Sequence, residues 1–140
     1  MYQLLQKELE IYRIYVIMLS GGKNMEFYSK KDIEGLKKEC HPYYVPDELF
    51  GSMQYKLVRL EVKWAYVACL NVLINSALYD NEGKAFMKSD HPALIDVLAK
   101  LANKKVDHEK MEGYIQELED HDLLTVSGKD IYLEKIERVF

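Results

Sequence analysis

The feature that most constrains the fold is the segment of residues 107–122, "DHEKMEGYIQELEDHD", together with the residues that follow it. Its apolar residues recur at i, i+3, i+4 and i+7, which predicts a helix with one buried stripe made of Met111, Tyr114, Ile115 and Leu118. The next stretch, "LLTVSGKDIYL", alternates apolar and polar residues around a glycine-containing turn and predicts a β-hairpin. A helix leading into a hairpin is typical of the winged-helix fold, an elaborated helix-turn-helix.

The segments before this helix complete the same order. Residues 56–79, "KLVRLEVKWAYVACLNVLINSALY", predict a long helix whose second half is apolar on nearly every side and therefore central and buried. After the turn "DNEG", "KAFMK" fits a short strand. "SDHPALIDVLAKLANK" then predicts a helix with Ser89 or Asp90 as N-cap and Pro92 in the first turn. The expected core residues of that helix are Leu94, Leu98, Leu101 and Ala102.

The fold class that we expect is therefore mostly α with a small β-hairpin, a winged helix with an N-terminal helical arm. A different small α+β domain is the alternative. We expect the arm at residues 1–24 and the winged-helix domain at residues 25–140, because "SGGKN" (20–24) interrupts the helical pattern between them.

The arm carries a heptad-like apolar seam. Its apolar residues are spaced 3-4-3-4-3, which predicts a helix that either docks on its own domain or mediates dimerisation. A β-strand through "YRIYVIML" is a third interpretation. The seam begins at Tyr2, and the residues that would dimerise are Leu5, Leu9, Tyr12, Val16 and Leu19.

Residues 29–40, "SKKDIEGLKKEC", predict a short helix capped by Ser29, with Asp32 in the fourth position of a capping arrangement. Its four lysines form the densest basic cluster of the chain, which is either a solvated face or a phosphate contact. The following "HPYYVPDELF" is expected to be extended, because each proline disfavours helical geometry in the residue before it.

Composition excludes several classes of function. The two cysteines have no CxxC spacing, and the four histidines have no ligand spacing, so reduced thiols and no metal site are expected. A P-loop, a glycine-rich dinucleotide turn and a GxSxG motif are all missing, which argues against an enzyme and against a cofactor. No apolar run is long enough to span a membrane, and acidic residues stand where a secretory signal would be basic, so we expect a cytoplasmic protein.

The charge distribution bears on nucleic-acid binding. The net charge is −4, and residues 80–140 hold nine Lys and Arg against fourteen Asp and Glu. Affinity for DNA therefore cannot come from the average charge. The predicted outer face of helix 107–122 is also acidic: it is centred on Glu109, Gly113, Gln116 and Asp120 and flanked by Glu112 and Glu117.

The stretch of residues 27–83, "FYSKKDIEGLKKECHPYYVPDELFGSMQYKLVRLEVKWAYVACLNVLINSALYDNEG", resembles the N-terminal domain of RepA-type replication initiators of Gram-positive plasmids. Downstream, "ELEDHDLL" and "IYL" are similar to the helix end and wing strand of that family, so the resemblance spans about residues 27–134. Phage replisome-organiser N-terminal domains are similar as well. The positions that carry the resemblance are Tyr44, Pro46, Leu49, Phe50, Tyr55, Lys56, Lys63, Tyr66, Ser76 and the turn from Asp80 to Gly83.

The resemblance implies a winged-helix domain that dimerises and binds repeated sequences in a plasmid origin through its helix and wing. One departure concerns the wing, which is basic in the family, whereas the turn here offers Lys129 against Asp130.

Two functions follow from these observations. In the first, the chain binds duplex DNA as an initiator-like or regulatory homodimer through Lys100, Lys104, Lys105, Lys110, Lys129, Lys30 and Lys31. In the second, the acidic helix face docks on a basic protein partner. A mid-helix glycine such as Gly113 costs about 1 kcal/mol relative to alanine, and close approach of another chain is one use for it.

Overall fold

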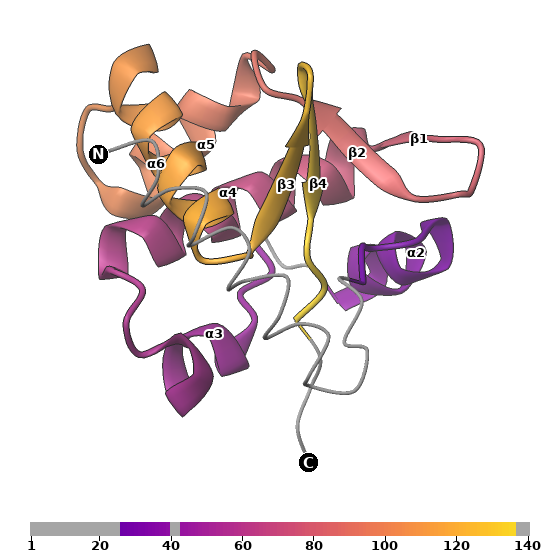
Figure 1. Cartoon of the computed structure of the whole chain (residues 1–140), viewed down its shortest axis with the longest axis horizontal. Helices are drawn as coiled ribbons and strands as arrows, with labels where there is room; N and C mark the ends of the chain where they lie inside the picture. Colours follow the sequence, from indigo (N-terminus) through magenta and orange to yellow (C-terminus); the bar gives the residue numbers. More distant parts are fainter. Residues whose placement is uncertain (1–25, 40–42, 137–140) are drawn as a thin grey trace, which may run out of the picture.

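A computed structural model describes residues 26–39 and 43–136. The predicted arm, with its seam residues from Leu5 to Leu19, lies outside the described residues, as does Cys40. Figure 1 shows the chain path. The elements are α2 (Lys30–Glu39), α3 (Asp47–Gly51), the 3-10 turn η1 (Met53–Tyr55), α4 (Leu60–Ser76), β1 (Leu78–Tyr79), β2 (Ala85–Lys88), α5 (Ala93–Ala102), α6 (His108–Asp120), β3 (Leu124–Ser127) and β4 (Asp130–Leu133).

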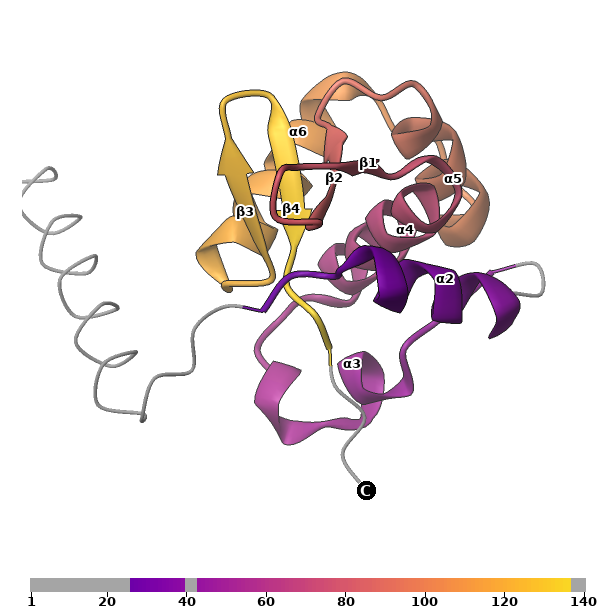
Figure 2. The same ribbon diagram turned by 90° about the vertical axis from the view of Figure 1, so that its right-hand side faces the viewer.

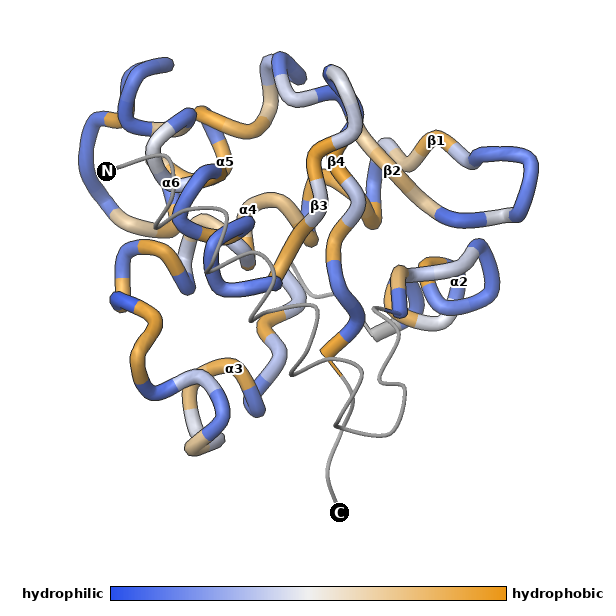
Figure 3. The backbone as a smooth tube through the Cα atoms, viewed as in Figure 1, coloured by the Kyte–Doolittle hydropathy of each residue, from blue (hydrophilic) through white to orange (hydrophobic). Residues whose placement is uncertain are grey.

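Helix α4 is the centre of the domain. It packs against α2, α5, α6 and β2, and an unbroken run from Ala65 to Ile74 is buried. Figure 1 shows α4 behind the strands, and Figures 1 and 2 both show α2 beside the β1–β2 hairpin. In Figure 3 the β1–β2 turn and the α5–α6 connection are hydrophilic, whereas β2 and β4 carry hydrophobic stretches. The predicted buried central helix is thus confirmed.

The four strands form one antiparallel sheet in the order β1-β2-β4-β3. The predicted hairpin is β3–β4, in which Val126 faces Ile131 and Ser127 faces Asp130. Strand β2 joins it through the pair of Met87 and Ile131, so the sheet extends beyond the predicted hairpin. The order of α4, β2, α5, α6 and the hairpin is that of a winged helix, and the predicted fold class is confirmed.

Three local predictions are wrong. The long helix runs from Leu60 to Ser76 rather than over residues 56–79, and the short strand β1 follows it. Residues 47–51 form α3 instead of an extended segment, because Pro46 restricts the residue before it and leaves those after it free to turn helical. The N-cap of α5 is Pro92 rather than Ser89 or Asp90.

The expected capping of α2 is confirmed. The Asp32 carboxylate accepts hydrogen bonds from the Ser29 backbone N–H at 2.9 Å and from the Ser29 hydroxyl at 3.0 Å. The Asp32 N–H in turn donates to the Ser29 hydroxyl at 3.3 Å. The predicted core of α5 is confirmed for Leu94 and Leu98, whereas Leu101 and Ala102 are half-buried. Over the two described ranges, no helix has the length and apolar character needed to cross a membrane.

Candidate nucleic-acid interface

Helix α6 holds the position of the second helix of a helix-turn-helix, and its local sequence fixes both of its ends. The Asp107 carboxylate caps the first turn by accepting from the Lys110 N–H at 2.8 Å. The inner stripe of Met111, Tyr114, Ile115 and Leu118 is buried as predicted. At the other end Asp122 takes a positive φ of 58°, and the chain turns directly into β3. Helix and hairpin are therefore held in a fixed relation.

One flank of α6 faces the start of α4 through ion pairs. The Arg59 guanidinium donates to both carboxylate oxygens of Glu117, at 2.7 and 3.2 Å. Lys104, in the α5–α6 turn, pairs with Glu61 at 2.9 Å, and the Tyr114 hydroxyl donates to the same Glu61 at 2.9 Å. The hydrogen bonds that Arg59 donates to Glu117 are the main reason why the pKa of Arg59 lies above its ordinary value.

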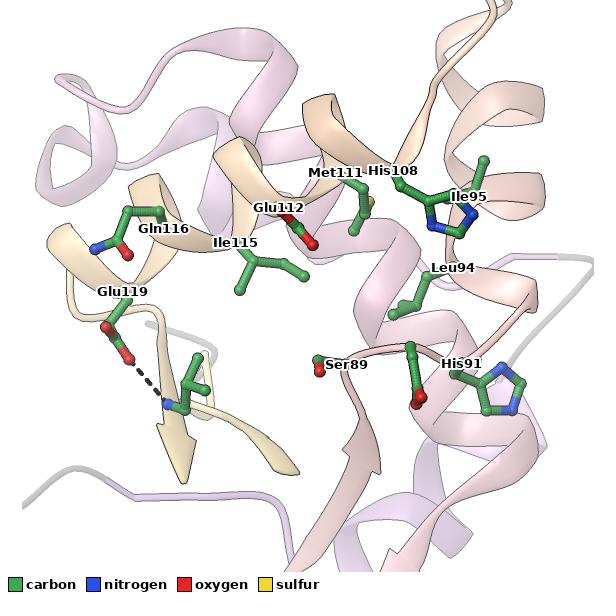
Figure 4. A pocket seen from close by; sticks show the side chains of 12 residues that line it. Ser89, His91, Leu94, Ile95, His108, Met111, Glu112, Ile115, Gln116 and Glu119 are labelled. Carbon is green, nitrogen blue, oxygen red and sulfur yellow. Dashed lines mark hydrogen bonds between the residues drawn. The ribbon is translucent and has the colours of Figure 1, made fainter. Parts of the chain in front are cut away.

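The opposite flank of α6 borders a hollow of about 270 Å³ between α6, the start of α5 and β3 (Figure 4). The Glu119 carboxylate accepts from the Val126 N–H at 3.0 Å, which ties the helix to the hairpin. Three carboxylates and no lysine or arginine are among the described residues that form its walls. Those residues are Ser89, Asp90, His91, Leu94, Ile95, His108, Met111, Glu112, Ile115, Gln116, Glu119 and Val126.

The outward face of α6 is exposed, as predicted. The Gln116 side-chain amide donates to Asp120 at 3.1 Å, so the one side chain of this face whose amide could hydrogen-bond a base edge is engaged within the helix. A Cβ on Gly113 would meet nothing within 4 Å, so packing within the described residues does not require glycine there. Glu109 and Glu112 place negative charge on this face, so the face is chemically unsuited to contact with phosphate.

The structure divides the seven predicted DNA-binding lysines into three groups. Lys100, Lys104, Lys105 and Lys110 surround the α5–α6 turn, and all are exposed. Lys129 is exposed in the β3–β4 turn, whose backbone is fixed because the Lys129 carbonyl accepts from the Ser89 N–H at 2.7 Å. Figures 1 and 2 show this turn and the β2–α5 connection at the same end of the molecule.

The third group, Lys30 and Lys31, lies elsewhere. The Lys30 N–H donates to the Gly83 carbonyl at 3.2 Å, and its ammonium group is 6.0 Å from the centre of the Tyr79 ring. Helix α2 therefore belongs to the β1–β2 side of the sheet, away from the β3–β4 turn (Figure 2). One straight duplex resting on α6 and the hairpin would not be expected to reach it.

Other chemistry finds little support among the described residues. No group of three or more His, Cys, Asp or Glu side chains there is arranged to hold a metal ion. Burial raises the pKa of the Cys69 thiol to about 12, so this side chain is no nucleophile at neutral pH. The His91 Nδ1 already accepts from the Ala93 N–H at 3.1 Å.

Sequence reasoning missed Arg59 and the hollow. Arg59 is 58 positions from Glu117, and no local pattern links them. One wall of the hollow could have been predicted in part, because His108, Glu112 and Glu119 share one side of an ideal helix. Its other wall comes from the β2–α5 connection. The sequence predicted that helix α5 begins within this connection, at Ser89 or Asp90.

No protein-family model matches the chain, and no curated protein matches it. Solved structures that are similar include the following three. The structure of an MDR initiator is 22% identical with a TM-score of 0.51, over 81% of this chain and 89% of that one. A Rep–DNA complex is 21% identical with a TM-score of 0.50, over 82% and 87%. An N-terminal domain of a DNA-binding protein is 19% identical with a TM-score of 0.48, over 84% and 88%. At these identities the first two likenesses establish a shared winged-helix fold.

Proposed function

We propose that the chain is a non-enzymatic protein that binds duplex DNA in replication or its regulation. The observation that carries this proposal is the likeness of 81% and 82% of the chain to the structures of an initiator and of a Rep–DNA complex. The resemblance in sequence to RepA-type initiators points the same way. It extends the proposal to a homodimer acting on repeated origin sequences of a plasmid or phage.

Contact with phosphates would come from beside α6 rather than from its outward face. Lys100, Lys105 and Lys110 are exposed around the α5–α6 turn, and Lys129 is exposed in the hairpin turn. Lys104 contributes less, because Glu61 already pairs with it. Neutralisation of phosphates supplies most of the non-specific affinity for DNA. The carboxylates of the outward face of α6 would therefore be held away from the DNA backbone.

A salt titration of binding to a labelled duplex tests this proposal. The double variant Lys105→Gln/Lys129→Gln should bind more weakly at low salt. Its slope of log K against log salt should shrink by about 0.9 for each lost phosphate contact. Lys31→Gln/Lys38→Gln is the matched control, since both lysines are exposed on α2. Equal effects of the two variants, or no binding of the natural chain to any duplex, would overturn the proposed contact surface.

A second candidate function is suggested by the hollow beside α6. Its described walls combine apolar side chains with the carboxylates of Asp90, Glu112 and Glu119 and hold no lysine or arginine. A basic protein segment suits such a surface, because lysine and arginine stems pack on apolar groups while their heads meet carboxylates. Partners captured in the native host should be lost with Glu109→Lys/Glu112→Lys, and an unchanged set of partners would contradict this candidate.

A further inference from the structure

The corner between α3 and α4 exposes large apolar side chains that no proposed function uses. Met53 is 76% exposed, Leu57 80% and Leu60 62%, all within eight residues of sequence. We call these three side chains the apolar corner. Single exposed apolar residues are normal, but three within eight residues of one connection favour an interaction surface.

Half-buried aromatic residues flank the apolar corner. The Phe50 and Trp64 rings contact each other at a tilt of 49° with centroids 4.9 Å apart, and Trp64 lies one helical turn after Leu60 on the same side of α4. Val58, between Leu57 and Leu60, is buried, so the segment is held against the core while its neighbours face outward. The corner is therefore a fixed apolar surface.

The described chain begins close to this corner. The Glu26 carbonyl accepts from the Lys135 N–H at 2.6 Å, and Phe27 pairs with Glu134. Burial, followed by the nearby Glu134 carboxylate, raises the pKa of Tyr55, the last residue of η1. Glu134 thus pairs with the first described residues and acts electrostatically on Tyr55, the last residue of the turn that carries Met53.

The sequence before Glu26 supplies an apolar surface of matching kind. Residues 2–19 carry the seam described above, and in helical form such a segment would be about 27 Å long. The six residues from Ser20 to Met25 can span about 20 Å when extended. The seam can therefore reach the apolar corner of its own chain.

We propose that the apolar corner is the docking surface of the chain's own residues 2–19, which cover Met53, Leu57 and Leu60 with the seam. A second copy is the weaker occupant, because three exposed side chains fall far short of the roughly 800 Å² per partner of a standard stable interface. A tethered segment needs less area, since the linker makes its docking intramolecular.

Site-specific photo-crosslinking in the full-length chain tests the proposal. The variant Leu57→p-benzoylphenylalanine places the crosslinker in the corner, and Lys37→p-benzoylphenylalanine places it on the exposed face of α2 as a matched control. Equal amounts of unlabelled and ¹⁵N-labelled chains are mixed before irradiation. Mass spectrometry then identifies the crosslinked peptides and whether both come from one chain.

From position 57 we expect crosslinks to residues 2–19 of the same isotope label, several-fold more frequent than from position 37. Adding Leu9→Ser/Tyr12→Ser should reduce that yield several-fold, and circular dichroism should report an unchanged domain. Equal yields from the two positions would overturn the proposal. Mixed-label crosslinks would overturn it too, because the occupant would then be a second copy.

Discussion

At the scale of single residues, Asn71 connects the central helix to the chain that crosses it. Its side chain is 2% exposed. The Nδ2 group donates to the Tyr44 and Val67 carbonyls at 2.8 and 2.7 Å, and Oδ1 accepts from the Tyr44 N–H at 2.8 Å. Asn71 therefore satisfies both backbone groups of Tyr44 in a segment without regular structure.

The variant Asn71→Leu should lower the free energy of unfolding by about 2–4 kcal/mol, because it strands buried backbone groups of Tyr44. Urea denaturation measures this loss. Asn75→Ala is the control one turn later, since its side chain is exposed and makes one described hydrogen bond, to the Asn71 carbonyl. It should cost about 1 kcal/mol or less. Equal losses in the two variants would contradict the role assigned to Asn71.

Asp32 predicts an acid dependence of stability. Burial opposes its ionisation, but hydrogen bonds from Ser29 and Lys135 outweigh burial and hold the pKa of Asp32 below its ordinary 3.8. A depressed pKa stabilises the folded state above the unfolded value, and this contribution is lost as pH falls below 3.8 toward the folded pKa.

Asp32→Asn should therefore be less stable than the natural chain near neutral pH, and the difference should narrow as pH falls through that window. Urea denaturation between about pH 6 and about pH 2.5 measures it. Glu34→Gln, an exposed carboxylate of the same helix, is the control. A difference that stays constant with pH would mean that the Asp32 charge plays no part.

At the scale of elements, two glycines in and after α6 should respond in opposite ways to alanine. Gly113 is helical with open space around its Cβ position, so Gly113→Ala should stabilise the fold by about 0.5–1 kcal/mol. Gly128 has a φ of 63° in the hairpin turn, so Gly128→Ala should destabilise it by about 1 kcal/mol.

Thermal unfolding of both variants measures these changes. If Gly113→Ala also leaves DNA and partner binding intact, close approach of another chain is no reason for the glycine. A loss of binding without a loss of stability would instead place a partner against α6. Destabilisation by Gly113→Ala would contradict the open environment described above.

The elements that the sequence predicted well are those with a complete local pattern. The α6 stripe, the Ser29 cap and the hairpin each rest on residues within a few positions of one another, and all three are confirmed. Helix α4 was predicted too long because "LINSALY" stays apolar past Ser76. Its end depends on pairing of Leu78 with Phe86, which only the folded sheet provides.

The candidate site was predictable to a smaller extent. Exposure of the α6 face followed from periodicity, but the grouping of lysines depends on how distant elements pack. Lys30 is separated from the hairpin turn because α2 packs beside Gly83, and Lys104 is engaged because α4 begins beside α6. Neither contact leaves a pattern within a short stretch of sequence.

At the scale of the whole molecule, charge is segregated around α6. Lysines surround the α5–α6 turn and occupy the hairpin turn, whereas carboxylates occupy the outward face and the hollow. A protein with net charge −4 that binds DNA must present its basic groups while keeping such carboxylates from the phosphates. The acidic face would then weaken binding to arbitrary DNA and leave the lysines to set the position of the duplex.

Reversing that face tests whether it lies near DNA. Glu109→Lys/Glu112→Lys moves the net charge from −4 to zero without touching a described hydrogen bond or ion pair. If α6 approaches the DNA backbone, the affinity of this variant for a random duplex should rise at low salt. Its slope of log K against log salt should become steeper by up to about 1.8 for two new phosphate contacts. Glu34→Lys/Glu82→Lys makes the same change of charge at exposed positions on the other side of the sheet. Equal gains from both pairs would show that net charge alone acts, and α6 would then be free of DNA and available to a protein partner.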